Sequence, residues 1–410
     1  MHPGAGLAFG ERVAYYRRAR GMYQHGLALR MNRSVSWVRK VESGARRVES
    51  ITVVEELARA LRVDAAVLLG GRLAHQPPPT PAGTAKTEAV AAVGRLLRSY
   101  DSLSAEADRG EPLSVDELRG QIASLRVRYN TVRNNLSAVV VDLPVAIAAV
   151  RRAVRHARGP DREAGYALLA DVLRLTAMEV RQYGDPELAW LAADRAVLAA
   201  ERSGDPLLVG AAAGTLVHQT ISRGRHLDAV MVALDAAATI RPRRDTTVAQ
   251  WSVWGALHLF AGQAAVRAGD GQYRSLLDAA GRAADAVAAD RNDYQTFFGP
   301  TNVAIQRAGI LVEAGDPAAA LRVAGYTDAD RLVSVNRRAN HRIHLARAHL
   351  MLGHDDEATA AIEDAERVGP ELVRTDPSSQ ETIAAVLGRR RRPPSRELAR
   401  LAVRLGVADG

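Results

Sequence analysis

The segment MNRSVSWVRKVESGARR, residues 31–47, predicts a short helix with two unlike faces. At 100° per residue, Val38 and Val41 fall within about 60° of each other and define the side that turns inward. The opposite side collects hydroxyl-bearing and basic side chains, namely Ser36, Arg39, Lys40 and Ser43. A short helix with such an outer face has the shape and the chemistry that the major groove of DNA accepts.

Apolar residues at helical spacing continue on both sides of this segment. Ser34 is placed to cap the helix, and Thr52 and Glu55 have the spacing of a capping box for the next one. The predicted helices are 9–20 with Gly21 after it, 24–31, the helix after Ser34, one that begins at Ser50 or Thr52, and one from Asp64 to Leu69. Five short helices make a complete small domain, which we place at residues 1–72.

The positive charge of the chain is concentrated in this domain. The 410-residue chain carries a formal charge of +9, and residues 1–75 hold 13 Arg and Lys against 6 Asp and Glu. Most of the excess therefore lies in less than a fifth of the chain. Such a concentration favours a polyanion as the partner of this segment.

Residues 7–71 resemble the lambda-repressor-like, xenobiotic-response-element (XRE) family of helix-turn-helix domains. The resemblance rests on Gln24-x-x-Leu27-Ala28, on the run from Ser34 to Gly44, and on Leu57-Ala58-x-Ala60-Leu61-x-Val63. It implies that Gln24 anchors to phosphate, that Val35, Ser36 and Lys40 face base edges, and that Ser43, Arg46 and Arg47 hold the DNA backbone. The whole interface that we expect is Gln24, Ser34, Val35, Ser36, Trp37, Arg39, Lys40, Ser43, Arg46 and Arg47.

Two residues in this region have roles that the pattern leaves open. Trp37 lies roughly 70° from the inward direction, so that it either seals the domain core or touches DNA. Glu42 resembles the structural acid of the family, with Arg17 or Arg18 of the first helix as its partner.

Two further residues depart from the family pattern. Tyr23 stands where a capping serine or threonine is common, and Gly26 lies inside the second helix at a cost of about 1 kcal/mol. A degenerate helix-turn-helix that contacts only protein is the alternative interpretation. The basic balance and the intact outer face favour DNA.

Beyond the first domain, proline and then helical periodicity divide the chain. Four prolines and a glycine predict a linker at 73–88, because proline interrupts a helix. Long apolar-periodic helices follow at 89–160 as connecting segments. We place helical repeats at 161–375 and a helical C-terminal cap at 376–410.

Glycine turns recur through the repeat region. They stand at Gly184, Gly224, Gly269, Gly315 and Gly353, each between two helical patterns. An alanine follows four of them five residues later, at Ala189, Ala229, Ala320 and Ala358, and Arg274 takes that place in the other. Helix, glycine turn and alanine-led helix in alternation predict a stacked array of helix pairs.

Residues 165–370 resemble a tetratricopeptide-repeat (TPR) array, most clearly in the last unit. There Leu345, Ala346, Ala358, Ile362, Ala365 and Pro370 match the large, small and proline positions of the repeat. We therefore expect an all-α protein, a five-helix helix-turn-helix domain followed by a right-handed TPR-like α-solenoid. The combination resembles bacterial regulators that join this DNA-binding domain to a helical-repeat sensor, including quorum-sensing types whose repeats bind signal peptides.

A ligand site is expected on the concave side of the array. Aromatic residues make up only 4% of the chain, yet they gather in TTVAQWSVWGALHLF and NDYQTFFGPTNVAIQR beside amide side chains. Such a mixture suits an extended peptide or a small amphipathic molecule. The candidate residues are Trp251, Trp254, His258, Phe298, Asn302 and Gln306. The alternative is that they fill gaps between the helices of one large repeat.

Several classes of function have no support in the sequence. The chain has no cysteine, and the histidines of NHRIHLARAHLMLGHDDE lack the HExxH arrangement, so we expect no metal site. No nucleophile–base pair or nucleotide loop stands out, so we expect no enzyme and no cofactor. No leader or membrane-spanning run is evident, and we expect a cytoplasmic protein with no membrane contact.

The hypothesis that follows is a ligand-responsive regulator of transcription. It would bind palindromic double-stranded DNA as a homodimer, with a signal peptide or a small molecule in the repeat array. The alternative is a TPR-type protein–protein adaptor whose contact with DNA is secondary.

Overall fold

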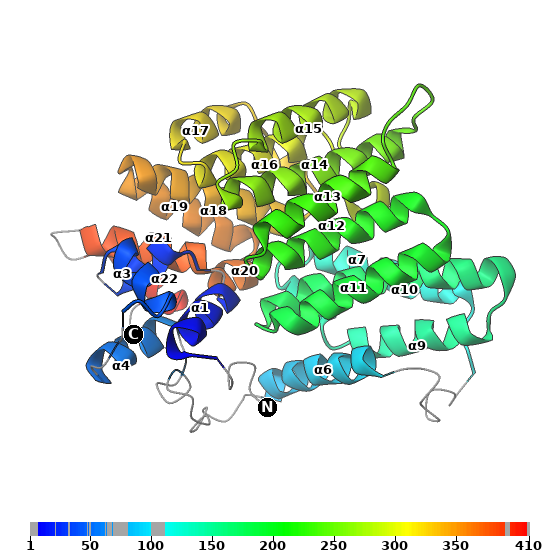
Figure 1. The fold of residues 1–410 in the computed structure, drawn as a ribbon, viewed down its shortest axis with the longest axis horizontal. Helices are drawn as coiled ribbons and strands as arrows, with labels where there is room; N and C mark the ends of the chain where they lie inside the picture. The colour runs from blue at the N-terminus through cyan, green and yellow to red at the C-terminus, as the bar shows by residue number, and fades with distance from the viewer. Residues whose placement is uncertain are drawn as a thin grey trace.

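The computed structural model describes most of the chain. The residues that lie outside the description are 1–6, 21, 32, 47, 49–50, 62, 64–67, 69–80, 100–110, 390–393 and 408–410. The described elements are all helical and form an N-terminal group of short helices beside a larger body of long ones (Figure 1). The all-α fold class is therefore confirmed. Within the described residues, every helix is too short or too polar to cross a lipid bilayer.

The N-terminal domain packs four described helices around one apolar core. They are α1 (Phe9–Ala19), α2 (Gln24–Arg30), α3 (Val35–Glu42) and α4 (Ile51–Leu61). Val13, Leu27, Val38 and Leu57 have no exposed surface, so each helix contributes a fully buried side chain. The Ser34 hydroxyl accepts a hydrogen bond from the backbone N–H of Trp37 at 3.1 Å, which confirms the predicted cap of α3. The predicted fifth helix, Asp64 to Leu69, falls almost wholly outside the described residues.

The linker is shorter than the sequence predicts. Residues 73–88 were expected to be non-helical, whereas α6 (Pro81–Arg98) begins inside that range. Proline is well tolerated at the first position of a helix, because its fixed φ suits the helix and its missing N–H has no partner there. The remainder of the predicted linker, 73–80, lies outside the described residues.

The body consists of connecting helices followed by five helix pairs and a C-terminal group. The connecting helices are α6, α7 (Val115–Thr131), α8 (Asn135–Val139) and α9 (Leu143–His156). The pairs are α10 (Gly159–Gln182) with α11 (Pro186–Ser203), α12 (Pro206–Ser222) with α13 (His226–Thr239), α14 (Val248–Ala268) with α15 (Tyr273–Val287), α16 (Pro300–Glu313) with α17 (Pro317–Gly325), and α18 (Val335–Leu352) with α19 (Asp355–Val368). Short 3-10 turns, η3 (Asp293–Gln295) and η4 (Ala329–Arg331), lie between pairs, and the last helices are α20 (Pro370–Thr375), α21 (Pro377–Arg389) and α22 (Arg396–Arg404).

The predicted glycine turns lie where the two helices of each pair meet. Gly184, Gly224, Gly269, Gly315 and Gly353 have φ values of 81°, 76°, 75°, 86° and 80°. Glycine alone adopts this left-handed conformation without a steric cost, so these turns explain the recurring residue. The alanines that follow them, Ala189, Ala229, Ala320 and Ala358, are all fully buried, because the partner helix packs closely against them. The stacked array of helix pairs is thus confirmed.

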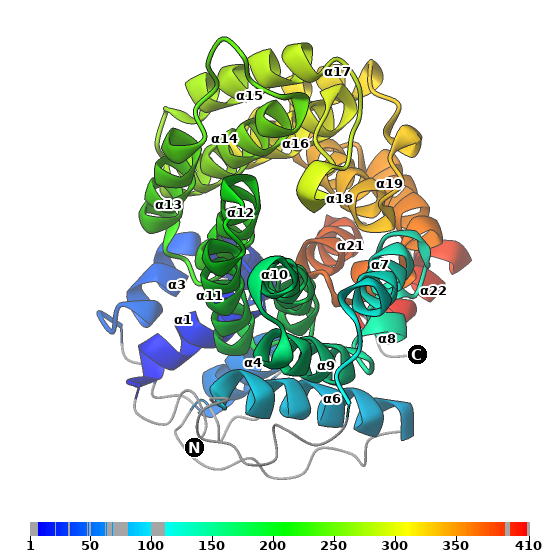
Figure 2. The same ribbon diagram turned by 90° about the vertical axis from the view of Figure 1, so that its right-hand side faces the viewer.

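The helices of the body are arranged in a ring in Figure 2, in which the connecting helices lie beside the last helices of the chain. Helix α7 contacts α18, and α8 contacts α20. Glu371 of α20 accepts hydrogen bonds from the backbone N–H of Ser137 at 3.0 Å and from its hydroxyl group, and its carboxylate lies 3.8 Å from the ammonium group of Lys86. These polar contacts join the connecting helices to the last repeat.

Candidate DNA-binding surface and interdomain cavity

The outer face of α3 is open to solvent. Val35, Ser36, Arg39 and Lys40 are exposed, while Val38 and Val41 on the other side are buried in the domain core. The exposed set continues beyond the helix with Ser43 and Arg46, and Ser34 is exposed at its start. The sequence-based division of this helix into an inner and an outer face is therefore correct. Arg47, which was assigned to the same surface, lies outside the described residues.

Two residues of the expected DNA interface are engaged within the domain. Trp37 is half-buried and packs against the core, with the guanidinium carbon of Arg33 5.8 Å from its ring centre. The side-chain amide of Gln24 donates a hydrogen bond to Glu42 at 2.9 Å. Glu42 also pairs with Arg17, whose Nη2 lies 2.9 Å from Oε2. Of the two partners expected for Glu42, Arg17 is the one used.

The domain packs against the body through the side of α2 that turns away from α3. Tyr23, the residue before α2, makes no capping hydrogen bond, and its ring points into the body instead. The guanidinium carbons of Arg267 and Arg347 lie 5.9 and 5.5 Å from the ring centre, within cation–π range. Burial, followed by the charge of Glu313, raises the pKa of the Tyr23 hydroxyl. The departure from a capping serine or threonine thus supplies a contact between domains.

Gly26 explains the second departure from the family pattern. A β-carbon at this position would overlap the carboxyl group of Glu381 on α21, so the end of the Glu381 side chain would have to move if residue 26 were larger than glycine. Arg30, one turn further along α2, donates to the Gln380 side chain at 3.3 Å. Positions 23, 26 and 30 share one side of α2 and together form its contact with the body.

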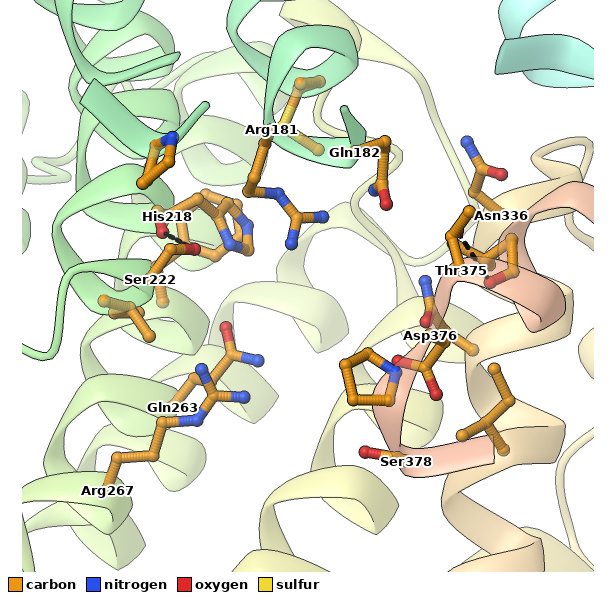
Figure 3. Close-up of a pocket in the computed structure, with 18 of the residues that line it drawn as sticks. Arg181, Gln182, His218, Ser222, Gln263, Arg267, Asn336, Thr375, Asp376 and Ser378 are labelled. Carbon is orange, nitrogen blue, oxygen red and sulfur yellow. Dashed lines mark hydrogen bonds between the residues drawn. The ribbon is translucent and has the colours of Figure 1, made fainter. Parts of the chain in front are cut away.

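A cavity of about 900 Å³ lies between the helix-turn-helix domain and the body (Figure 3). Its walls come from α1–α4 on one side and from α7, α10, α12, α14, α16, α18, α20 and α21 on the others. In Figure 3, Arg181 and His218 lie on one wall, and Asn336, Asp376 and Ser378 lie on the opposite wall. The volume is within the range of small-molecule sites in proteins, roughly 300–1,000 Å³.

The cavity carries an excess of positive charge. Eleven arginines and three acidic residues line it. Two of the acids are already paired: Glu42 with Arg17, and Glu313 with Arg267 in a two-bond contact of 2.7 and 2.7 Å. Asp376 accepts hydrogen bonds from the backbone N–H and hydroxyl of Ser379 at 2.8 and 3.1 Å.

Two histidines in the cavity are kept neutral by this environment. Burial, and then the charges of Arg181, Arg337 and Arg267, lower the pKa of His218 to about 3. Burial lowers the pKa of His344 to about 4. The ring of Phe260 meets His218 edge to face at 4.5 Å. Neutral imidazoles can donate or accept one hydrogen bond at each nitrogen, so both are available to a polar ligand.

Three of the six residues suggested for ligand binding form an aromatic group away from this cavity. The rings of Trp251 and Trp254 meet edge to face at 5.7 Å, and Trp254 stacks at 3.8 Å on His258. The Nδ1 atom of His258 lies 2.9 Å from the Trp254 carbonyl oxygen. None of the three lines the cavity, and both tryptophans pack on apolar clusters of α12–α16.

The other three suggested residues lie in three different environments. Phe298 is fully buried against Gly255, and Asn302 is 2% exposed and accepts a hydrogen bond from Arg337 at 2.7 Å. Gln306 is the one suggested residue that lines the cavity. The six therefore do not converge on a common site in the described residues.

The arginines of the cavity are not evident from any one segment of the sequence. Arg181, Arg267, Arg337 and Arg347 come from three different helices. A signal was present in α18, where Arg337, Asn340, His344 and Arg347 recur at helical spacing and all line the cavity. A polar stripe on a repeat helix whose other side is buried indicates a functional concave face.

One comparison with known proteins identifies the first domain. Residues 8–69 match the model of a family described as a helix-turn-helix domain. No curated protein sequence matches the chain. Among solved structures, the crystal structure of Bacillus thuringiensis PlcR in complex with the peptide PapR7 and DNA is similar, with 13% identity and a TM-score of 0.30 over 68% of this chain and 95% of that chain. A likeness this distant says nothing about what the present chain binds.

Proposed function

We propose that this chain is a sequence-specific DNA-binding regulator of transcription whose helical-repeat body binds a signal ligand. The observation that carries the proposal is the free outer face of α3, on which Ser36, Arg39 and Lys40 remain exposed although the domain is packed against the body. An exposed basic helix behind a capped turn is the element that helix-turn-helix proteins insert into the major groove. We also propose that the domain is of the lambda-repressor-like, XRE type.

The residues of α3 divide by the chemistry that each offers to a duplex. Val35 can meet a thymine methyl group, and Ser36 and Lys40 can hydrogen-bond to base edges. Ser34, Arg39, Ser43, Arg46 and Arg47 are assigned to the DNA backbone, and Gln24 and Trp37 to the border of the interface. Contacts with the DNA backbone give affinity without sequence preference, whereas contacts with the bases give specificity.

The proposal includes a homodimer on a palindromic operator. Two α3 helices would enter successive major grooves about 34 Å apart, and the bodies would fix that separation. Such a spacing requires the domain to be held at a defined angle to its body. The contacts of Tyr23, Gly26 and Arg30 with the body supply that restraint.

The ligand would bind in the cavity between the two parts. Because helices of the helix-turn-helix domain form one of its walls, an occupant would touch both parts at once. A ligand changes DNA affinity only if it prefers one arrangement of the domains, by a coupling of about 1–3 kcal/mol. A site at the interface meets that condition most directly. Peptides and small molecules both fit the proposal.

The test is a comparison of DNA affinities at physiological salt. The full chain is titrated against a library of palindromic duplexes and the selected sequence is compared with random duplex, and light scattering gives the stoichiometry. We expect at least about 1,000-fold preference for the selected sequence and two chains per duplex. Equal affinity for selected and random DNA would refute the proposal.

A further inference from the structure

Three arginines of the cavity have no acidic partner. Arg181 comes from α10, and Arg337 and Arg347 come from α18. In the described part of the chain, no carboxylate is within ion-pair distance of any of the three, whereas Arg267 and Arg17 are paired. None of the three guanidinium groups therefore has a direct ion-pair partner, and the carboxylates of Asp376 and Glu381 act on Arg181 and Arg347 only from a greater distance.

Two of the three guanidinium groups are held in place by neighbouring side chains. Arg337 donates to the Asn302 side chain at 2.7 Å and to the Thr296 carbonyl oxygen at 2.8 Å, which fixes its position at the cavity wall. Arg347 lies against the ring of Tyr23. Arg181 points into the open space near His218 and Gln182 (Figure 3), and burial lowers its pKa.

The three side chains are partly buried and face the cavity. A cluster of like charges that no ion pair neutralises is unfavourable, and proteins retain such clusters chiefly at functional sites. Asp376 is the one cavity acid outside an arginine pair, and a single carboxylate is too little for three arginines. A bound anion would supply the direct partner that the chain does not provide.

Apolar side chains line the same cavity between the arginines. Leu257 and Phe260 of α14, Ile221 of α12 and Met178 of α10 all contribute to the wall. A simple inorganic anion has no apolar part to pack against such a surface, whereas an organic molecule has one. The lining thus combines charge recognition with cover for an apolar skeleton.

We infer that the cavity binds a small organic molecule with two or more negatively charged groups, phosphate or carboxylate, held by Arg181, Arg337 and Arg347. Guanidinium groups suit both anions, because their planar N–H pairs match two oxygens at once. The apolar part of the molecule lies along Leu257 and Phe260. This inference rests on the proposed function, since it names the chemical class of the signal ligand.

The first experiment uses the full-length protein without DNA. Citrate and inorganic pyrophosphate are titrated by calorimetry as carboxylate and phosphate probes, with uncharged trimethyl citrate as the matched control. We expect saturable binding of at least one anion at one site per chain, and no binding of the ester. The anion that binds more tightly identifies which group the natural ligand carries. Absence of binding by both anions up to millimolar concentration overturns the inference.

The second experiment uses charge-neutralising variants. Arg181→Gln should weaken binding of the anion by about 10- to 100-fold, and Arg181→Lys should retain part of it. Arg244→Gln removes the same charge from an exposed loop outside the cavity and should leave binding unchanged. Since Arg181 makes no hydrogen bond or ion pair within the part of the chain that the structure describes, its glutamine variant should melt no lower than the wild type when no anion is present.

The outcomes separate this inference from the proposed function. If Arg181→Gln, Arg244→Gln and the wild type bind the anion with equal affinity, the anion binds outside this cavity. That result would overturn the inference even if operator binding is intact. Anion binding with the expected variant pattern, in a protein that does not discriminate between DNA sequences, would support the inference and refute only the regulator.

Discussion

Gly26 of α2 packs directly against the carboxyl group of Glu381 on α21, in a contact where a β-carbon would force that carboxyl group to move. Glu381 is 8% exposed, and its Oε1 atom has no hydrogen-bond partner. The contact joins residues 355 positions apart and, with Tyr23 and Arg30, fixes the helix-turn-helix domain on the body. A helix interior is an unfavourable place for glycine, so the close approach accounts for its presence.

Gly26→Ala should therefore loosen the contact between α2 and α21 while leaving both parts folded. Alanine favours the helix itself by about 1 kcal/mol, so α2 should remain helical in an isolated domain. We expect faster hydrogen exchange in both α2 and α21, measured by mass spectrometry. Gly120→Ala, at a helical glycine with open space around it, serves as the control. Unchanged exchange in α21 would show that the docking contact tolerates a β-carbon.

Glu381 should make stability depend on pH. Burial raises its pKa to about 7 from 4.5, while Arg30, Arg347 and Arg17 act in the opposite direction and Asp376 in the same one. Between these values the folded protein keeps a proton that the unfolded chain releases. The stability that the neutral acid provides is complete below about pH 4.5 and is lost as the pH rises to about 7, by at most about 3 kcal/mol.

Glu381→Gln should remove this dependence. The variant should match the wild type near pH 5 and unfold at a higher denaturant concentration at pH 8, with Glu163→Gln on an exposed position as the control. The raised pKa of Glu179 acts in the same direction but is common to all three proteins. An equal difference at both pH values would exclude titration of Glu381 as the cause.

Arg46 and Lys40 should affect DNA binding in different ways. Arg46→Gln removes a proposed phosphate contact, so it should weaken binding to all sequences alike and reduce the salt slope by about 1. Lys40→Gln should cost about 1–3 kcal/mol at one base position and relax the preference there. Fluorescence anisotropy at several salt concentrations measures both. The assignment fails if Arg244→Gln, with a charge loss far from α3, gives the same salt effect as Arg46→Gln.

The Glu371 contacts should hold the array closed. Glu371→Gln weakens the ion pair with Lys86 and the hydrogen bonds with Ser137, so we expect a loss of about 1–3 kcal/mol in unfolding free energy. Small-angle scattering should show a larger radius of gyration. Glu366→Gln breaks an ion pair with Arg404 near the surface. It should change the unfolding free energy by no more than about 1 kcal/mol and should leave the radius of gyration unchanged.

Phe298 distinguishes packing from ligand binding in the aromatic segments. Because the side chain is fully buried and fills the space beside Gly255, Phe298→Ala should cost about 3–5 kcal/mol. Anion binding to the protein that remains folded should keep its wild-type affinity, measured at low temperature. A selective loss of binding with normal stability would instead assign Phe298 to the ligand site.

Local patterns were enough to predict the elements of this protein. The two faces of α3, the Ser34 cap, the five glycine turns and the buried alanines depend on residues within a few positions of one another, and the sequence shows these directly. The start of α6 at Pro81 was missed, because proline breaks a helix in the middle but suits its first position.

The sites depend on contacts that no local pattern contains. Tyr23 and Gly26 are unfavourable choices for the second helix by itself, and only their contacts with the body account for them. Arg181 and Arg347 are 166 positions apart and face one cavity only because the array closes on itself. Periodicity states which side of a helix is buried, whereas the curvature of the array decides which polar sides meet, and that curvature is the sum of many small packing angles.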